Sequence, residues 1–170
     1  MKFKAILVLF GLLTIYGCAG SKNFIPKGYK GVDAGYVILS LGASTETKYQ
    51  SYALLIRKKD KSAETTIMYM PDNMFSPTKK DFIENDSHGF VSVRNLPQGE
   101  YEIYNFDVFE NLGLIQTHYK AKNDFSIPFS VSTGKITYLG EYIAFTVAKG
   151  LFGTSTGGAV APCTVGSVLS

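Results

Sequence analysis

Short runs of alternating apolar and polar residues, separated by turn-forming residues, occupy most of the chain after residue 33. Such runs, of roughly 7 to 11 residues here, are typical of half-buried β-strands, in which successive side chains point to opposite faces. Residues 125–131 show the pattern most clearly. Four apolar side chains share one face there, and three others share the opposite face: Phe125, Ile127, Phe129 and Val131 against Ser126, Pro128 and Ser130. No amphipathic helix is evident between the runs, so the pattern predicts an all-β sandwich or barrel.

The expected strands are residues 34–41, 49–57, 63–70, 89–96, 100–109, 114–120, 125–131 and 136–147. Pro97-Gln98-Gly99 predicts a tight hairpin, because proline presets one turn angle and glycine accepts a positive φ. Pro128 cannot donate a backbone hydrogen bond, so its strand is expected at a sheet edge or with that position facing outward. Gly140 predicts a bend or a bulge in the last strand.

Residues 72–87 form the longest stretch without strand character. They are expected to be a solvated loop, which a helical turn at residues 79–83 would shorten. Its four acidic residues do not follow the spacing of a calcium loop. Long loops in compact domains often carry function, so this loop is a candidate partner site.

The first 17 residues have the features of an export signal. Lys2 and Lys4 precede an apolar stretch that is shorter than the roughly 20 residues needed to span a membrane. Ile15-Tyr16-Gly17-Cys18 then resembles a bacterial lipobox, which implies that fatty-acyl chains on Cys18 anchor the protein to a membrane. Ala19 takes the place of the aspartate that retains lipoproteins at the inner membrane, which implies the outer membrane. The alternative is an ordinary secretory signal cleaved after Ala19 or Gly20.

These features divide the chain into four parts. Residues 1–17 are the signal, residues 18–33 the lipidated cysteine with a flexible linker, and residues 34–149 one β-sandwich domain. Residues 150–170 form a tail rich in Gly, Ser and Thr, expected either to be loosely held or to pair with an edge strand. The whole chain has 17 basic and 14 acidic residues, a balance that predicts no nucleic-acid partner.

The residues that most often carry catalysis or bind metals are sparse. Cys163 has no partner in its own chain once Cys18 carries lipid, so it is expected to pair with another chain or to have no role. His88 and His118 do not match a metal-ligand spacing, so no metal and no cofactor is expected. A Ser-His-Asp hydrolase would use one of these histidines with Asp86 or Asp107.

Two further sets of side chains lie in the expected strand at residues 100–109. Glu100 and Glu102 would share a strand face as a glycosidase carboxylate pair does, although a solvent face explains them more simply. Four aromatic residues are candidates for a surface contact with sugar rings or a protein, because alternation places some of them outward: Tyr101, Tyr104, Phe106 and Phe109.

Residues 90–103 include Leu96-Pro97-Gln98-Gly99-Glu100-Tyr101, which is similar to the Leu-Pro-x-Gly-x-Tyr core of transthyretin-like and carboxypeptidase-regulatory-like β-sandwich domains. Residues 129–140 resemble a pattern in small bacterial lipoproteins of the DUF2846 type. The resemblance implies an antiparallel β-sandwich of about seven to eight strands, transthyretin-like or Ig-like, and it implies no catalytic residue. Such domains serve as structural, folding-assisting or carbohydrate-contacting accessories.

The leading hypothesis from the sequence is a non-enzymatic lipoprotein of the bacterial envelope that contacts a protein or a glycan. An envelope hydrolase and a component of a multiprotein surface assembly are the alternatives. A cleft that joins a histidine, a carboxylate and a serine would favour the hydrolase, and a concentration-dependent oligomer would favour the assembly. The sequence does not define the oligomeric state.

Overall fold

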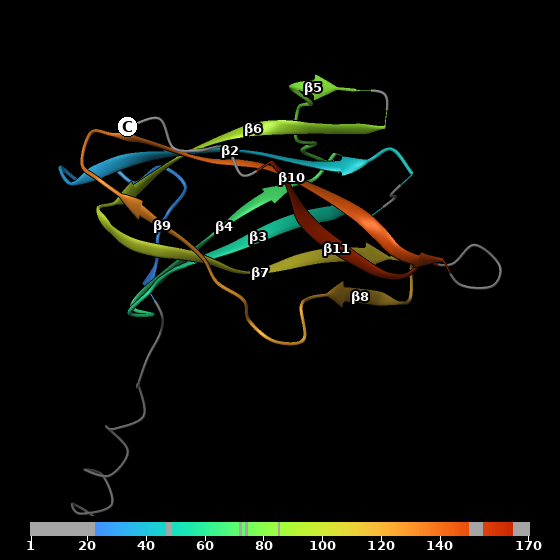
Figure 1. Cartoon of the computed structure of the whole chain (residues 1–170). Helices are drawn as coiled ribbons and strands as arrows, with labels where there is room; N and C mark the ends of the chain where they lie inside the picture. Colours follow the sequence, from blue (N-terminus) through green and yellow to red (C-terminus); the bar gives the residue numbers. More distant parts are fainter. Residues whose placement is uncertain are drawn as a thin grey trace, which may run out of the picture.

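The computed structural model describes residues 23–46, 49–71, 73, 75–84, 86–149 and 155–164, and they form β-strands in two sheets (Figure 1). No α-helix occurs in these ranges, which confirms the all-β prediction. Accordingly, none of the described segments is a helix that could cross a membrane.

One sheet has six strands: β1 (Asn23–Phe24), β3 (Ser51–Lys58), β4 (Ala63–Tyr69), β7 (Gly99–Asn111), β8 (Gln116–Tyr119) and β9 (Ile127–Val131). Their order is β1-β4-β3-β7, and β7 carries β9 on its first half and β8 on its second half. The short β1 runs parallel to β4 and covers only the start of that strand. The rest of β4 therefore has no neighbouring strand on that side in the described structure.

The other sheet has five strands: β2 (Ala34–Ser44), β5 (Phe82–Ile83), β6 (Ser87–Pro97), β10 (Ile136–Lys149) and β11 (Ser155–Thr164). Their order is β11-β10-β2-β6-β5. β2 and β10 are parallel, so the sheet is mixed and not purely antiparallel. Figure 1 shows β2, β6 and β10 as one layer above β3, β4 and β7.

The core fills the space between the two layers with aliphatic and aromatic side chains, including Leu39, Leu41, Leu54, Ile56 and Ile103. A row of aromatic rings crosses it from one sheet to the other: Tyr49, Tyr52, Tyr69 and Phe90. Successive ring centroids in the row lie 6.1, 6.0 and 5.5 Å apart. The row ends at Phe90 on β6, at the border of the site described below.

The turn at Pro97-Gln98-Gly99 does not close a hairpin, so that prediction is wrong. β6 pairs with β2 and β5, whereas β7 pairs with β3, β8 and β9. The turn therefore carries the chain from one sheet to the other, with Gly99 at a φ of 150° and the Gln98 N–H donating to the Asp33 carbonyl at 3.0 Å. Proline and glycine specify that the chain turns here, but they do not specify which strands pair.

Two predicted details of the strands are confirmed. Pro128 is exposed on β9, and the apolar residues around it face the core. Gly140 has a φ of 91° and lies where the pairing of β10 with β2 shifts register between Tyr138 and Glu141, which is a bulge.

Three segments outside the predicted strands take part in the sheets. The segment assigned to a flexible linker contributes β1 from Asn23 onward and buries Ile25 in the core, whereas Phe24 is 62% exposed. A single buried residue produces no periodicity, so the sequence pattern gave no sign of it. In the predicted loop, residues 82–83 form β5, and residues 79–83 form no helical turn. The tail contributes β11, which pairs antiparallel with β10. The signal residues and Cys18 lie outside the described residues.

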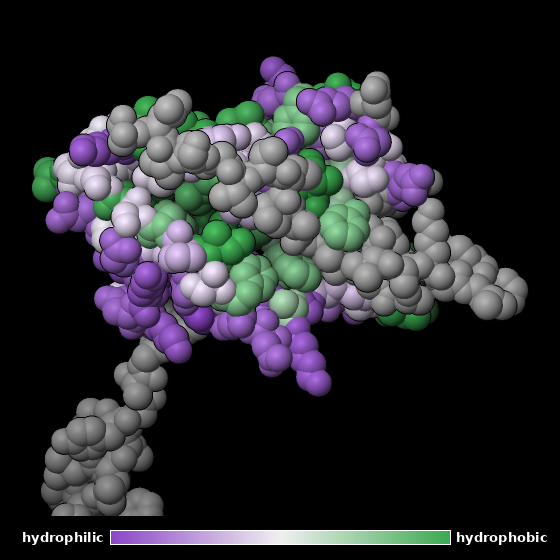
Figure 2. All heavy atoms as spheres, in the orientation of Figure 1, coloured by the Kyte–Doolittle hydropathy of each residue, from purple (hydrophilic) through white to green (hydrophobic). Residues whose placement is uncertain are grey.

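Figure 2 shows hydrophilic side chains concentrated at the corner of the molecule that the β3–β4 turn occupies in Figure 1. This turn holds the charged run Lys58-Lys59-Asp60-Lys61, as the sequence indicates. The start of β1 lies at the same end, because Asn23 pairs with Ala63. The described domain therefore begins at a basic corner.

Candidate functional site

A groove of about 620 Å³ opens along one side of the molecule, where the two sheets face each other without a connecting strand. β4 provides Met68 on one wall, and β6 provides Phe90 on the other. Lys27 and the segment around Thr78 line its remaining borders. Thr78 is fixed there, because its N–H donates to the Met70 carbonyl at 2.9 Å and its hydroxyl accepts from the Met70 N–H at 3.0 Å.

The backbone of both walls has unpaired strand edges. On β6, the Val91 N–H points away from β2, because it donates to the Asp81 carboxylate at 2.9 Å. Backbone groups alternate sides along a strand, so Val93 also presents its N–H and C=O to the groove. On β4, the Glu64 carbonyl accepts from the Ile25 N–H, so the same alternation directs the backbone of Thr66 and Met68 to the groove. Among the described residues, no strand pairs with these edges.

Arg94 is the distinctive side chain of the groove. It points between the sheets and is only 7% exposed, yet its Nε atom has no hydrogen-bond partner. Within the described ranges, no carboxylate forms an ion pair with it. Burial lowers the pKa of the Arg94 guanidinium because the charged form loses water without gaining an anion. Burying an unpaired charge destabilises the fold unless an anionic ligand pairs with it.

Ser92 provides a second buried polar atom in the groove without a hydrogen-bond partner among the described residues. Its side chain is 3% exposed and its Oγ atom has no hydrogen-bond partner, two positions before Arg94 on the same face of β6. Lys27 and Lys79 add positive charge at the groove, and Asp81 is the acidic residue of its lining. Three cations against one anion give the groove a positive balance, with donors at its floor and apolar side chains at its walls.

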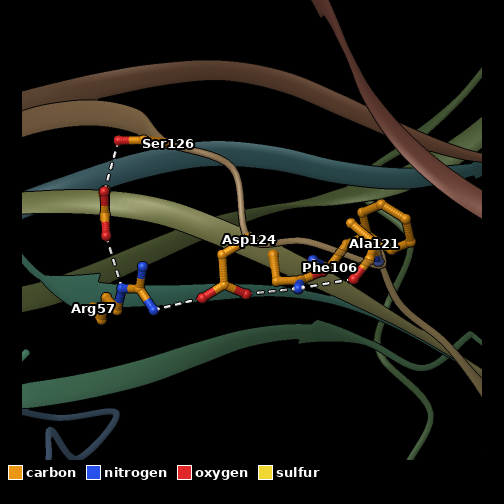
Figure 3. A network of polar contacts seen from close by, with 7 residues as sticks. Arg57, Phe106, Ala121, Asp124 and Ser126 are labelled. Atoms are coloured by element: carbon orange, nitrogen blue, oxygen red, sulfur yellow. Dashed lines mark hydrogen bonds and ion pairs between the residues drawn. The ribbon is translucent and has the colours of Figure 1, made fainter.

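The chain has a second arginine, Arg57, in the opposite state (Figure 3). Its Nε donates to Glu102 Oε1 and its Nη1 to Asp124 Oδ2, both at 2.7 Å. Its guanidinium also lies 4.2 Å from the centre of the Tyr104 ring. Burial lowers its pKa, but the bonds to Glu102 and Asp124 outweigh that effect, so the pKa of Arg57 is raised. This arginine therefore has two carboxylate partners and an aromatic ring.

The network continues beyond Arg57 and fixes the segment that leads into β9. Ser126 Oγ donates to Glu102 Oε2 at 2.6 Å, and Asn105 Nδ2 donates to Asp124 Oδ1 at 3.0 Å. Asn105 also accepts from the Ala121 N–H at 3.0 Å. Each dashed contact in Figure 3 joins two groups of this protein, so the cluster holds β3, β7 and the segment before β9 together.

The four aromatic residues predicted as a surface contact do not form one surface. Tyr101 is fully buried, stacks on Phe129 and donates its hydroxyl to the Pro97 carbonyl at 2.8 Å, so it offers nothing to a partner. Tyr104 lies against Arg57, and Phe106 packs against Phe125 with a centroid distance of 6.4 Å. Phe109 packs against His118 at 4.8 Å.

The histidines do not assemble a triad with the serines of the described segments. His88 Nδ1 lies 2.6 Å from the buried Tyr69 hydroxyl, not against Asp86. His118 Nδ1 does lie 2.8 Å from Asp107 Oδ1, the acid that the sequence pointed to, but this pair is on the surface and Lys120 approaches the same carboxylate. No serine hydroxyl of the described residues bonds to either ring.

The remaining candidates are distributed elsewhere. Glu100 accepts from Ser130 at 2.7 Å, whereas Glu102 belongs to the Arg57 network, so the two carboxylates have separate structural partners. No cluster of three metal-ligating side chains occurs among the residues that the structure describes. Cys163 lies in β11, and Cys18 lies outside the described residues.

The sequence analysis did not identify Ser92 and Arg94, the two residues of the groove whose buried polar atoms have no hydrogen-bond partner in the described part of the chain. The run Val91-Ser92-Val93-Arg94 places two valines in one phase and two polar residues in the other, which on hydropathy alone predicts inward valines. The structure has the reverse, with Val91 45% and Val93 55% exposed. The available signal was the phase of Phe90 and Leu96, the apolar residues on either side, which match Ser92 and Arg94 and not the valines.

Comparison with known proteins adds little to this geometry. No protein-family model matches the chain, and no curated protein matches it. The chain is similar to a solved leucine-rich repeat protein from Bacteroides thetaiotaomicron, with a TM-score of 0.40 and 13% sequence identity. The match covers 66% of this chain but 14% of that one, and a likeness of this degree carries no argument about function.

Proposed function

We propose that this protein is a non-enzymatic binding module of the bacterial envelope whose groove between β4 and β6 takes an anionic group of a ligand. The observation that carries the proposal is Arg94, a buried arginine without a counter-charge at the floor of an open groove. A carboxylate or phosphate there would accept hydrogen bonds from the Arg94 guanidinium. The Ser92 hydroxyl lies on the same face of β6, next to this position. Charge-assisted hydrogen bonds of this kind are among the strongest that a polar site offers.

The test uses the fact that the chain has only two arginines. The full chain in detergent, labelled with ¹⁵N-arginine, should give two Nε–H signals in an NMR spectrum. Titration with acetate or inorganic phosphate should shift the signal that disappears in Arg94→Met and leave the signal that disappears in Arg57→Met. A titration that moves neither signal, or moves that of Arg57 alone, would contradict the proposal.

The proposal includes the cellular location that the sequence indicates, which is the outer membrane, with the protein anchored by lipid on Cys18. The basic β3–β4 corner beside β1 supports an approach to anionic headgroups at the tethered end. The intact mass and membrane fractionation of the wild type and Cys18→Ser test this part. We expect the wild type to be acylated and to fractionate with the outer membrane, and Cys18→Ser to be unmodified. If both proteins are unmodified and soluble, lipid anchoring through Cys18 is refuted.

The fold type belongs to the same proposal. We assign the two sheets to a sandwich of the transthyretin-like or Ig-like class, supported by the bond from the Tyr101 hydroxyl to the Pro97 carbonyl at the turn between the sheets. Sandwich domains of this class often have a tyrosine that bonds backbone a few residues upstream. A crystal structure that lacks two packed sheets in this order would reject the assignment.

A further inference from the structure

The groove offers more than a charge, because its β6 wall is an unpaired strand edge. β5 pairs with β6 only at Gly89 and His88, and Gly28 bridges to Asn95. Between these contacts, the Val91 carbonyl and both backbone groups of Val93 face the groove. Unpaired edge groups of this kind are a template for another extended chain.

The outer face of the same sheet is apolar beside that edge. Cross-strand neighbours form a row on this face: Val93 pairs with Ile38, which is partly buried, and Ile38 pairs with Tyr138. Tyr36 pairs with Ile136 next to this row. Val93 is 55%, Tyr138 45% and Ile136 64% exposed. An added strand beside β6 would extend this face, with its outward side chains next to Val91 and Val93.

The inner face of an added strand would meet Arg94. Residues directly opposite in paired strands have Cβ atoms about 4.5–5.5 Å apart and point to the same side. A residue opposite Arg94 therefore directs its side chain between the sheets toward the guanidinium. Aspartate or glutamate at that position supplies the missing charge, and apolar residues on either side of it face outward.

We infer that the ligand is a short extended peptide segment, about four residues of which add to β6 as a strand, with an acidic side chain on Arg94 and apolar residues beside it. This inference rests on the proposed anion-binding function. It selects a peptide over a free anion or a charged glycan, because only a peptide satisfies the backbone groups of Val93 and the apolar face together with Arg94. The partner is therefore a protein segment that is extended or becomes extended on binding.

The test begins with a random linear heptapeptide library on phage, selected on the full chain in detergent. Sequences with one acidic residue between β-branched or aromatic residues should be enriched. Synthetic capped versions of an enriched peptide should lose about tenfold or more in affinity when the acid is replaced by its amide. N-methylation of single backbone amides should weaken binding several-fold at alternate positions only.

Protein variants locate the binding on β6. Val93→Pro removes the N–H that faces the groove without removing a bond to β2, and it should abolish binding. Val93→Ile retains both this N–H and an apolar side chain, so it should weaken binding far less than Val93→Pro does. Arg94→Met should abolish binding of the acidic peptide, with Arg57→Met as the matched control. Circular dichroism of each variant checks that it folds.

The outcomes separate this inference from the function on which it rests. If acetate shifts the Arg94 signal but no peptide is enriched, or N-methylated peptides bind equally well, strand addition is wrong and anion binding stands. If acetate does not shift the Arg94 signal and Arg94→Met does not weaken binding of any peptide, both strand addition and anion binding are wrong. Peptides that bind Val93→Pro as tightly as the wild type also overturn strand addition.

Discussion

The two arginines of this chain lie in opposite environments. Arg57 is held by two carboxylates and an aromatic ring, within a network in which each polar group has a partner. Arg94 is more deeply buried and has none among the described residues. Proteins satisfy buried charges where the fold requires it, so a charge left unsatisfied beside an open groove indicates a group that a ligand completes. The first region holds the domain together, and the second is the site that we propose for binding.

The largest expected effect is on ligand binding. Arg94→Met should weaken binding of an acidic peptide selected on this protein by about 2–5 kcal/mol, because the ligand carboxylate would enter a site without its charge partner. Arg57→Met should leave binding unchanged, since that side chain does not line the groove. Isothermal titration calorimetry of the two variants measures the difference. Equal losses would remove the distinction between the two regions.

A second effect compares the buried polar side chains next to each arginine. Asn105→Ala should lower the free energy of unfolding by about 2 kcal/mol, because it leaves Asp124 and the Ala121 backbone without their partner. Ser92→Ala should not lower it, because the Ser92 hydroxyl has no bond to lose. Urea unfolding of the two variants tests the pair. A large loss of stability in Ser92→Ala would mean that the groove serves the fold.

The pH dependence of stability should report on the Arg57 region. Hydrogen bonds from Ser126 and then Arg57 lower the pKa of Glu102 below its ordinary 4.5, and bonds from Asn105 and Arg57 lower that of Asp124 below 3.8. Both groups therefore stabilise the fold above about pH 5 and lose this contribution as the pH falls through their folded-state values. Unfolding at pH 6 and pH 3 should show Arg57→Met about 1 kcal/mol less stable than the wild type at pH 6, and this difference should be smaller at pH 3. A difference that is as large at pH 3 as at pH 6 would argue against the ion pairs.

The smallest expected effect concerns the exposed lysines of the groove. Lys27→Gln and Lys79→Gln should each weaken binding of the acidic peptide by less than about 1 kcal/mol, and the loss should vanish in high salt, because exposed charges are screened. The effect of Arg94→Met should persist in high salt. Calorimetry at two salt concentrations makes the comparison. A lysine effect as large as that of Arg94, and as resistant to salt, would place the binding energy at the groove entrance.

Much of the fold follows from local sequence, because alternation reports which face of a strand is buried. Of the strand predicted at residues 125–131, residues 127–131 form β9 with the predicted faces, and Gly140 lies at the predicted bulge. The partner of each strand is not local information, and the turn after β6 therefore led to an incorrect hairpin. β1 and β11 lack strong alternation and form strands because β4 and β10 offer them an edge.

The candidate site was harder to predict for a physical reason. Hydropathy assigns valines to the core and arginine to the surface, and Val91 to Arg94 follow neither rule. The long apolar strand β2 and the residues Phe90 and Leu96 fix the register of β6, and the polar side chains point inward as a result. Conflicts between local preference and the global fold tend to occur at functional sites, which is what distinguishes this segment from the aromatic residues of β7.

The sign of the stability change in the two arginine variants tests the central claim most directly. Equilibrium urea unfolding of the full chain in detergent without ligand should show Arg94→Met more stable than the wild type by about 1–3 kcal/mol, because methionine fills the site without an unpaired charge. Arg57→Met should be less stable by about 1 kcal/mol. An Arg94→Met variant that is destabilised as much as Arg57→Met would show that Arg94 already has its partner within the chain, and the account of the groove would be wrong.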